Sequence, residues 1–168
     1  MFKSKIVFGI AAALILGSGW SVSALAATVN GDANASIVAA IGISQTTAMS
    51  FGNVIPHATL TDTVTVSTAG VRTTGANLTE AGGTVSQGVF AVTGSDKVFT
   101  ITLPAGAATL NGSGGGTMTV DTWSSNPAAT GTIVAGTATL NVGAVLNVGA
   151  AQTAGNYTGQ YAVTVDYQ

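Results

Sequence analysis

The 168-residue sequence has no cysteine, one histidine and few charged residues, and each shortage excludes a class of site. Without cysteine, the chain has neither a disulfide framework nor thiolate metal ligands, so packing and hydrogen bonds must hold the fold. The single histidine, His57, is too few for the usual zinc ligand sets, and its place after Pro56 indicates a solvated turn. Only 6% of the residues are charged, which leaves no basic surface for nucleic acid.

The sequence also lacks the residue patterns of catalysis. Serine is abundant, but no motif joins it to His57 as nucleophile and base. The glycines of residues 112–116 are not followed by the lysine and hydroxyl residue of a phosphate-binding loop. Asp32, Asp96 and Asp121 occur singly rather than in an oxygen-rich calcium loop. We therefore expect a protein that is not an enzyme and that has no cofactor or metal site.

The beginning of the sequence contains an export signal. Lys3 and Lys5 precede an apolar run over residues 6–16, and the small residues of Ser23–Ala26 suit signal peptidase. We predict that residues 1–26 are a signal peptide cleaved after Ala26. The run is shorter than the ~20 residues that span a bilayer core, so we expect an exported protein that is not integral to a membrane. Two basic and six acidic residues then remain, a net charge of −4.

The following sequence is a succession of short β-strand patterns. Clusters of Gly, Ser, Asn and Pro separate runs rich in β-branched and aromatic residues, at Asp62–Val66, Val89–Val92, Val98–Leu103 and Met118–Trp123. Gly94–Lys97 is predicted to be a hairpin turn, and Asn111–Gly116 a flexible loop tip. No segment has the sustained 3.6-residue apolar period of a helix. We therefore predict an all-β domain over residues 45–168, built as a sandwich or barrel.

The last segment of the chain has the clearest alternation. Every second residue belongs to an apolar face, formed by Tyr157, Gly159, Tyr161, Val163, Val165 and Tyr167, and the residues between them are mostly polar. Successive side chains of an extended strand point to opposite faces. The pattern therefore predicts one strand from residue 157 to residue 167 that buries its aromatic and β-branched row.

A second alternating segment lies in residues 27–44, which we treat as an N-terminal extension and first strand. Apolar or small residues recur at every second position, at Val29, Gly31, Ala33, Ala35 and Ile37. Such a strand can pair in its own sheet or in the sheet of a neighbour. Its small side chains would make it a slim insert that enters a groove without overpacking it.

These features together resemble subunits of chaperone-usher fimbriae, and more loosely the related exported spore-coat-U-like β-domains. The last strand alternates, a glycine, Gly155, precedes it, and its penultimate residue is Tyr167. The segment Met49–Pro56 also resembles the Phe-Gly segment that follows the first strand of such domains. Many members of the fimbrial family have a disulfide, which this chain lacks, so the chain is similar to a divergent branch.

The resemblance implies an immunoglobulin-like β-sandwich that lacks one strand, which a periplasmic chaperone and then the N-terminal extension of the next subunit supply. Carried over to this chain, Val29–Ile37 would be the donor strand. Gly155 and the apolar face of Tyr157–Tyr167 would form one wall of the acceptor groove and be recognised by the chaperone. The implied partners are neighbouring copies or related subunits, the chaperone and an outer-membrane usher. The implied location is the cell surface or the extracellular space, reached through the periplasm.

Two other exported architectures stay open. One is a self-complete secreted sandwich with a coat-like or adhesive role. In an adhesive protein Trp123, predicted on the same strand face as Asp121 and Thr119, would offer a platform for sugars, although burial against residues 124–129 is the preferred interpretation. The other is an outer-membrane β-barrel, which is less favoured because the strand patterns are short and aromatic residues are few.

Overall fold

A computed structural model describes residues 26–168 and shows that this part of the chain is all-β. The predicted signal peptide lies almost entirely outside the described residues. Residues 26–168 contain no helix, and therefore none of the length and apolar character needed to span a membrane. Every strand pair in this range is antiparallel. The predicted all-β class is thus confirmed.

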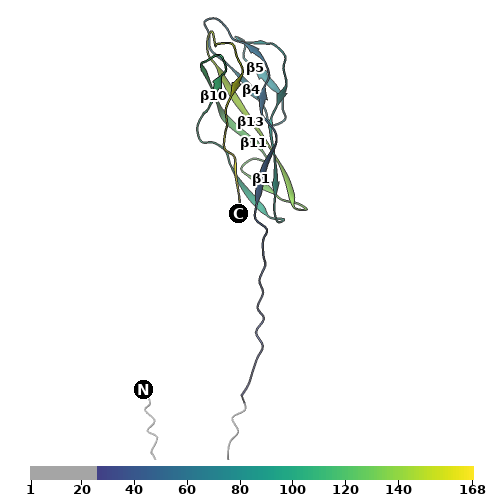
Figure 1. Cartoon of the computed structure of the whole chain (residues 1–168). Helices are drawn as coiled ribbons and strands as arrows, with labels where there is room; N and C mark the ends of the chain where they lie inside the picture. The colour runs from purple at the N-terminus through teal and green to yellow at the C-terminus, as the bar shows by residue number, and fades with distance from the viewer. Residues whose placement is uncertain (1–25) are drawn as a thin grey trace, which may run out of the picture. The chain divides into compact units, whose positions relative to one another are not determined.

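The larger sheet is organised around one long strand, β13 (Thr137–Val148). One edge of β13 pairs with β11 (Thr117–Asn126). The other edge pairs first with β8 (Gly88–Thr93) and then with β4 (Asp62–Val66), and Figure 1 shows β13 among β4, β10 and β11. The outer strands of this sheet are β1 (Gly42–Thr47) on β8, β5 (Arg72–Thr74) on β4, β10 (Ala108–Gly112) on β11, and β14 (Tyr157–Thr158) on β10.

The remaining strands form smaller sheets. In the three-stranded sheet, β9 (Val98–Thr102) lies between β12 (Thr130–Thr132) and β15 (Thr164–Tyr167). Two further pairs are very short: β2 (Ser50–Phe51) with β7 (Val85–Ser86), and β3 (Val54–Ile55) with β6 (Thr79–Glu80). The chain thus builds one large sheet and several partial ones, which gives the predicted sandwich two unequal layers.

The buried apolar residues form two clusters that differ in how they are covered. In the first, Phe90 and Leu140 of the large sheet pack against Phe99 and Val165 of the three-stranded sheet. The second lies under the C-terminal half of β13 and consists of Val64, Leu78, Val120, Ala144, Leu146 and Val148. Among the described residues, none from β9, β12 or β15 belongs to the second cluster or packs against it. The three-stranded sheet therefore does not cover this half of the core.

The sequence patterns located strands more accurately than connections. β4 has the predicted bounds Asp62–Val66, and Asn111–Gly116 spans the tip of the β10–β11 hairpin. The predicted hairpin turn at Gly94–Lys97 is wrong, because β8 before it pairs with β1 and β13 whereas β9 after it pairs with β12 and β15. Turn-forming residues predict a change of direction but not the partner of the next strand.

The predicted single strand from residue 157 to residue 167 is interrupted in the structure. β14 pairs with β10, residues 159–163 form no strand, and β15 pairs with β9. The segment changes partner because it passes from the large sheet to the three-stranded sheet. The alternation itself is confirmed, since all the even-numbered residues from 158 to 166 are exposed while Val165 is buried and both Tyr157 and Tyr161 are half-buried.

The alternating segment near the N-terminus forms no strand. Residues 26–41 form no strand, and the first strand begins at Gly42. Val29 is 93% exposed and Ile37 is 98% exposed. A division between two structural units falls after Ala35. The predicted alternation of residues 29–37 is thus not accompanied by strand structure.

Candidate functional site

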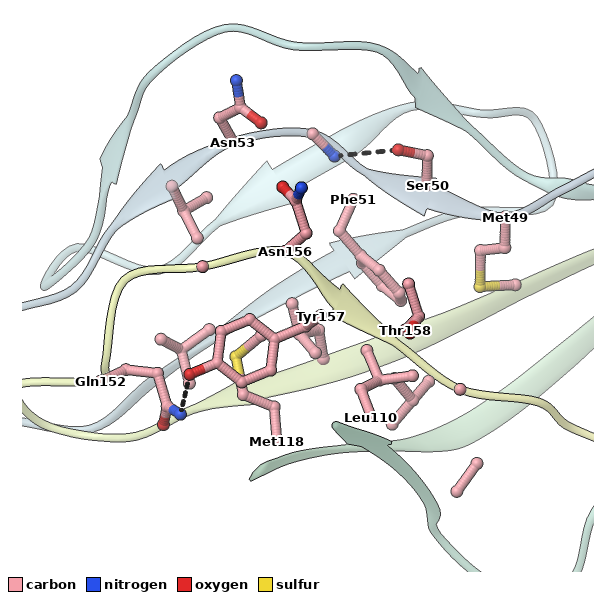
Figure 2. A pocket seen from close by; sticks show the side chains of 18 of the residues that line it. Met49, Ser50, Phe51, Asn53, Leu110, Met118, Gln152, Asn156, Tyr157 and Thr158 are labelled. Atoms are coloured by element: carbon pink, nitrogen blue, oxygen red, sulfur yellow. Dashed lines mark hydrogen bonds between the residues drawn. The ribbon is translucent and has the colours of Figure 1, made fainter. Parts of the chain in front are cut away.

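An apolar cavity of about 750 Å³ lies over the second core cluster. Residues 48–56 form one wall and residues 152–161 the other. Figure 2 shows Phe51 and Tyr157 directed toward the cavity, with Leu110 and Met118 beneath them. The complete floor consists of Ala108, Leu110, Met118, Val120, Trp123, Leu146 and Val148.

A second, smaller cavity of about 280 Å³ extends this space toward β1. It adds Gln45 and Phe90 to the lining, and it shares Ala48, Met49 and residues 159–161 with the larger cavity. We call the two cavities together the groove. The groove follows the segment 45–56 on one side and the last segment of the chain on the other.

The first wall, residues 48–56, is held from behind by Arg72, whose side chain is 10% exposed. Nη1 of Arg72 donates to the carbonyl oxygens of Phe51 (3.2 Å) and Asn53 (3.5 Å), and Nη2 lies 2.7 Å from a carboxylate oxygen of Glu80. The hydrogen bond from Arg72 holds the pKa of Glu80 below its usual value. Gly52 has a φ of +72°, and a side chain there would collide with the guanidinium. The Phe-Gly pair thus places an apolar ring in the groove and leaves room for Arg72 behind it.

The second wall is fastened to the tip of the β10–β11 hairpin. The amide of Ser113 donates to the carbonyl of Asn156 (2.9 Å), and the amide of Asn156 donates to Oγ of Ser113 (3.0 Å). The Tyr157 hydroxyl donates to the carbonyl of Thr153 and accepts from Nε2 of Gln152, both at 2.7 Å. A Cβ at Gly155 would lie 2.9 Å from the backbone nitrogen of Gly114. Gly155 is therefore required for close packing of this wall on the hairpin.

Both walls present strand edges that lack a partner on the groove side. β2 pairs only with β7, and β3 pairs only with β6. β14 is the last strand of the large sheet and pairs only with β10. Within residues 26–168, no strand lies between the two walls. Unpaired edges beside an apolar floor are a template for the addition of another strand. The arrangement suits an extended peptide better than a compact ligand.

Trp123 belongs to the floor of the groove, which corrects the predicted orientation of its side chain. The pairing of β11 with β13 shifts register between Asp121 and Ser124, and Thr122 has a φ of +51°. This β-bulge turns Trp123 to the face of Val120, where its ring stacks on Tyr161 at 4.7 Å. Its indole N–H donates to the carbonyl of Gly106 (3.1 Å). Trp123 is therefore covered by Tyr161 and is not a free platform for sugars.

The structure divides the residues predicted for the acceptor wall into two groups. Gly155, Tyr157 and Tyr161 line the groove. Val163, Val165 and Tyr167 instead pack on the first core cluster. Only the first part of this residue series therefore borders the groove, because the chain then leaves for the three-stranded sheet.

Tyr167 has a separate structural role where the N-terminal segment enters the domain. Its hydroxyl accepts from the amide of Ser95 (2.7 Å) and donates to the carbonyl of Ala39 (2.9 Å). The amide of Ala39 in turn donates to Oγ of Ser95 (2.9 Å). We call these three residues the Ala39 clamp. It fixes the chain just before β1.

The five residues predicted for the donor strand are exposed and belong to no strand. They are Val29, Gly31, Ala33, Ala35 and Ile37. Sequence reasoning missed the floor residues of the groove, such as Leu110, Met118 and Leu146, because alternation shows that they face a core but not that this part of the core lacks a covering strand. The Phe-Gly segment was the only sequence signal for the first wall.

The residues considered for metal binding or acid-base chemistry have local structural roles. Nδ1 of His57 accepts from the amides of Thr59 (3.1 Å) and Leu60 (3.2 Å), which shapes the predicted turn. Oδ1 of Asp96 accepts from the amide of Gly136, and Oδ2 of Asp121 accepts from Nδ2 of Asn147. In the part of the chain that the structure describes, no three metal-ligating side chains come together.

Comparison with known proteins identifies the domain by family alone. A family model described as "Domain of unknown function (DUF4402)" matches residues 41–167, which span all of the strands from β1 to β15. No curated protein and no solved structure matches the chain.

Proposed function

We propose that this chain, which belongs to the DUF4402 family, is an exported structural subunit of a cell-surface fibre that assembles by β-strand donation. One observation carries the proposal. An apolar groove runs between two unpaired strand edges, on a chain whose exposed segment 29–37 has the alternation of a strand. The domain is then an immunoglobulin-like sandwich that lacks one strand.

The donor segment and the groove are matched in length and chemistry. Residues 29–37 and the wall residues 48–56 are equal in number, and each extended segment spans at most about 30 Å. The apolar face of the donor would cover the floor of the groove, and its backbone would pair with β2, β3 and β14. Gly31, Ala33 and Ala35 keep the middle of the donor slim, where Tyr157 already fills part of the groove.

Donation from one copy to the next generates a filament. The donor segment and the groove are different surfaces, so the contact is heterologous and does not close on itself. The partners are neighbouring copies or related subunits. Before assembly the groove would expose apolar surface and free backbone groups. A periplasmic chaperone would cover this surface, and an outer-membrane usher would receive the complex of chaperone and subunit.

Deletion of residues 27–37 tests the proposal. The deleted chain keeps the groove and should stay monomeric by size-exclusion chromatography with light scattering, whereas the intact chain should form a ladder of oligomers that are visible as filaments by electron microscopy. A matched control is Ala33→Asp, which keeps the length but places a charge on the apolar face of the donor. An intact chain that stays monomeric, or a deleted chain that polymerises equally well, would reject strand donation in favour of a self-complete secreted sandwich.

A further inference from the structure

The chain contains two Asn-Gly pairs in opposite structural settings. Asn30–Gly31 lies in the exposed segment that forms no strand, and a Cβ at Gly31 would meet nothing within 4 Å. Asn111–Gly112 lies in β10, where Asn111 pairs with Thr117 of β11 on one edge and with Thr158 of β14 on the other. The same chemical group is thus free at one site and held at the other.

An asparagine followed by glycine can react with its own backbone. The amide nitrogen of the glycine attacks Cγ of the asparagine, the bond from Cγ to Nδ2 breaks, and ammonia leaves, which gives a five-membered succinimide. Water then opens either carbonyl of the ring, giving aspartate or isoaspartate. Ring closure requires free rotation of the backbone, which glycine without a Cβ permits and a paired strand prevents.

We infer that Asn30 is a site of spontaneous deamidation and isomerisation, and that this reaction limits how long the donor segment of an unassembled chain stays competent. The second part rests on the proposed function. Asn30 lies between Val29 and Gly31 of the donor face, so the reaction changes the backbone inside the donor segment. Once the segment is paired in a groove, the backbone of Asn30 is held as that of Asn111 is.

The two products differ in their effect on a donor strand. Aspartate adds one negative charge to the polar face, beside Asp32. In isoaspartate the main chain runs through the side-chain carbonyl and is one methylene longer. The alternation of strand faces after residue 30 is therefore out of register with the alternation before it. Val29 and Ile37 then cannot both lie on the floor of the groove. Isoaspartate should therefore exclude a chain from assembly more strongly than aspartate does.

The first experiment measures the chemistry in the intact chain, taken from its unassembled monomeric fraction. The chain is aged at neutral pH and 37 °C, and peptide mapping by mass spectrometry with electron-transfer fragmentation counts aspartate and isoaspartate at each site. Asn30 should convert several-fold faster than Asn111, and Gly31→Ala should slow the conversion at residue 30. Equal rates at the two asparagines, or a rate unaffected by Gly31→Ala, would overturn the inference.

The second experiment tests the consequence for assembly. Aged chains are allowed to assemble, and the isoaspartate content at residue 30 is compared between filaments and the unassembled fraction. Depletion from filaments supports the limit on donor lifetime, and equal content in both fractions overturns it. If no filaments form even from fresh chains, strand donation is rejected, while the rates at Asn30 and Asn111 still decide the chemistry of the site.

Discussion

Tyr161 illustrates at the residue scale how the aromatic face of the last segment contributes to the groove. Its ring stacks on Trp123 and meets Phe90 edge to face, with ring centroids 4.7 and 6.1 Å apart. Its hydroxyl is buried and has no hydrogen-bond partner among the described residues. A buried polar group without a partner costs free energy, while the ring around it contributes packing.

Tyr161→Phe should therefore stabilise the free chain. Removal of the unpaired hydroxyl should raise the free energy of unfolding by about 1 kcal/mol in urea titrations. Burial raises the pKa of Tyr161 from 10.0 to about 12, so the folded chain holds the phenol proton more tightly than the unfolded chain does. Wild-type stability should fall as the pH rises from 10 toward 12, and the advantage of the variant should grow over that range. A variant less stable than wild type at pH 7 would contradict this account.

Tyr167 acts at the same scale through its hydroxyl alone. Tyr167→Phe should lower the free energy of unfolding by about 1 kcal/mol and speed hydrogen exchange at the amide of Ser95, because the Ala39 clamp loses both bonds of the phenol. Ser95→Ala removes the remaining bond to Ala39. If the clamp is one unit, the double variant should cost less than the sum of the two single variants. Strict additivity would show that the clamp is not a unit.

At the scale of elements, the first groove wall depends on one guanidinium. Arg72→Met should lower the free energy of unfolding by about 2 kcal/mol, because the carbonyls of Phe51 and Asn53 and the Glu80 carboxylate lose a charged donor. The amide of Asn53, which donates to Gly82, should exchange faster. Arg72→Lys is the matched control, since a single ammonium keeps the charge but cannot replace the forked geometry. Full recovery by lysine would contradict the proposed role.

At the scale of elements, the sequence predicted the positions of several strands but not how those strands are arranged. Local patterns located β4 and the tip of the β10–β11 hairpin, because propensity and turn chemistry act over a few residues. They failed at Gly94–Lys97 and at Trp123, where the outcome depends on which sheet receives the next strand and on a bulge in β11. Gly155 and Tyr157, which the sequence predicted to face a groove, line the cavity. The floor was not, because the absence of a covering strand is a property of the tertiary arrangement.

On the scale of the whole molecule, the sandwich is covered at one end and open at the other. The first core cluster lies between two sheets, whereas the second borders the groove. A ligand that binds only the folded state stabilises it, by about 2.7 kcal/mol at a hundred times its Kd. A synthetic peptide of residues 27–38 should therefore raise the melting temperature of the chain that lacks residues 27–37. The same peptide with Ala33→Asp should raise it much less, and equal effects would contradict a specific apolar contact.

Because the sequence has no cysteine, introduced cysteines can test directly whether residues 29–37 are donated into the groove. Chains with Ala33→Cys are mixed under mild oxidation with chains that carry Met118→Cys on the groove floor, or Val71→Cys, which is 62% exposed and outside the groove. Strand donation predicts a large excess of mixed covalent dimers with Met118→Cys over those with Val71→Cys. The dimers with Met118→Cys should be lost when the donor chain also carries Ala35→Asp. Equal yields from the two acceptor positions would contradict the donation of residues 29–37 into the groove.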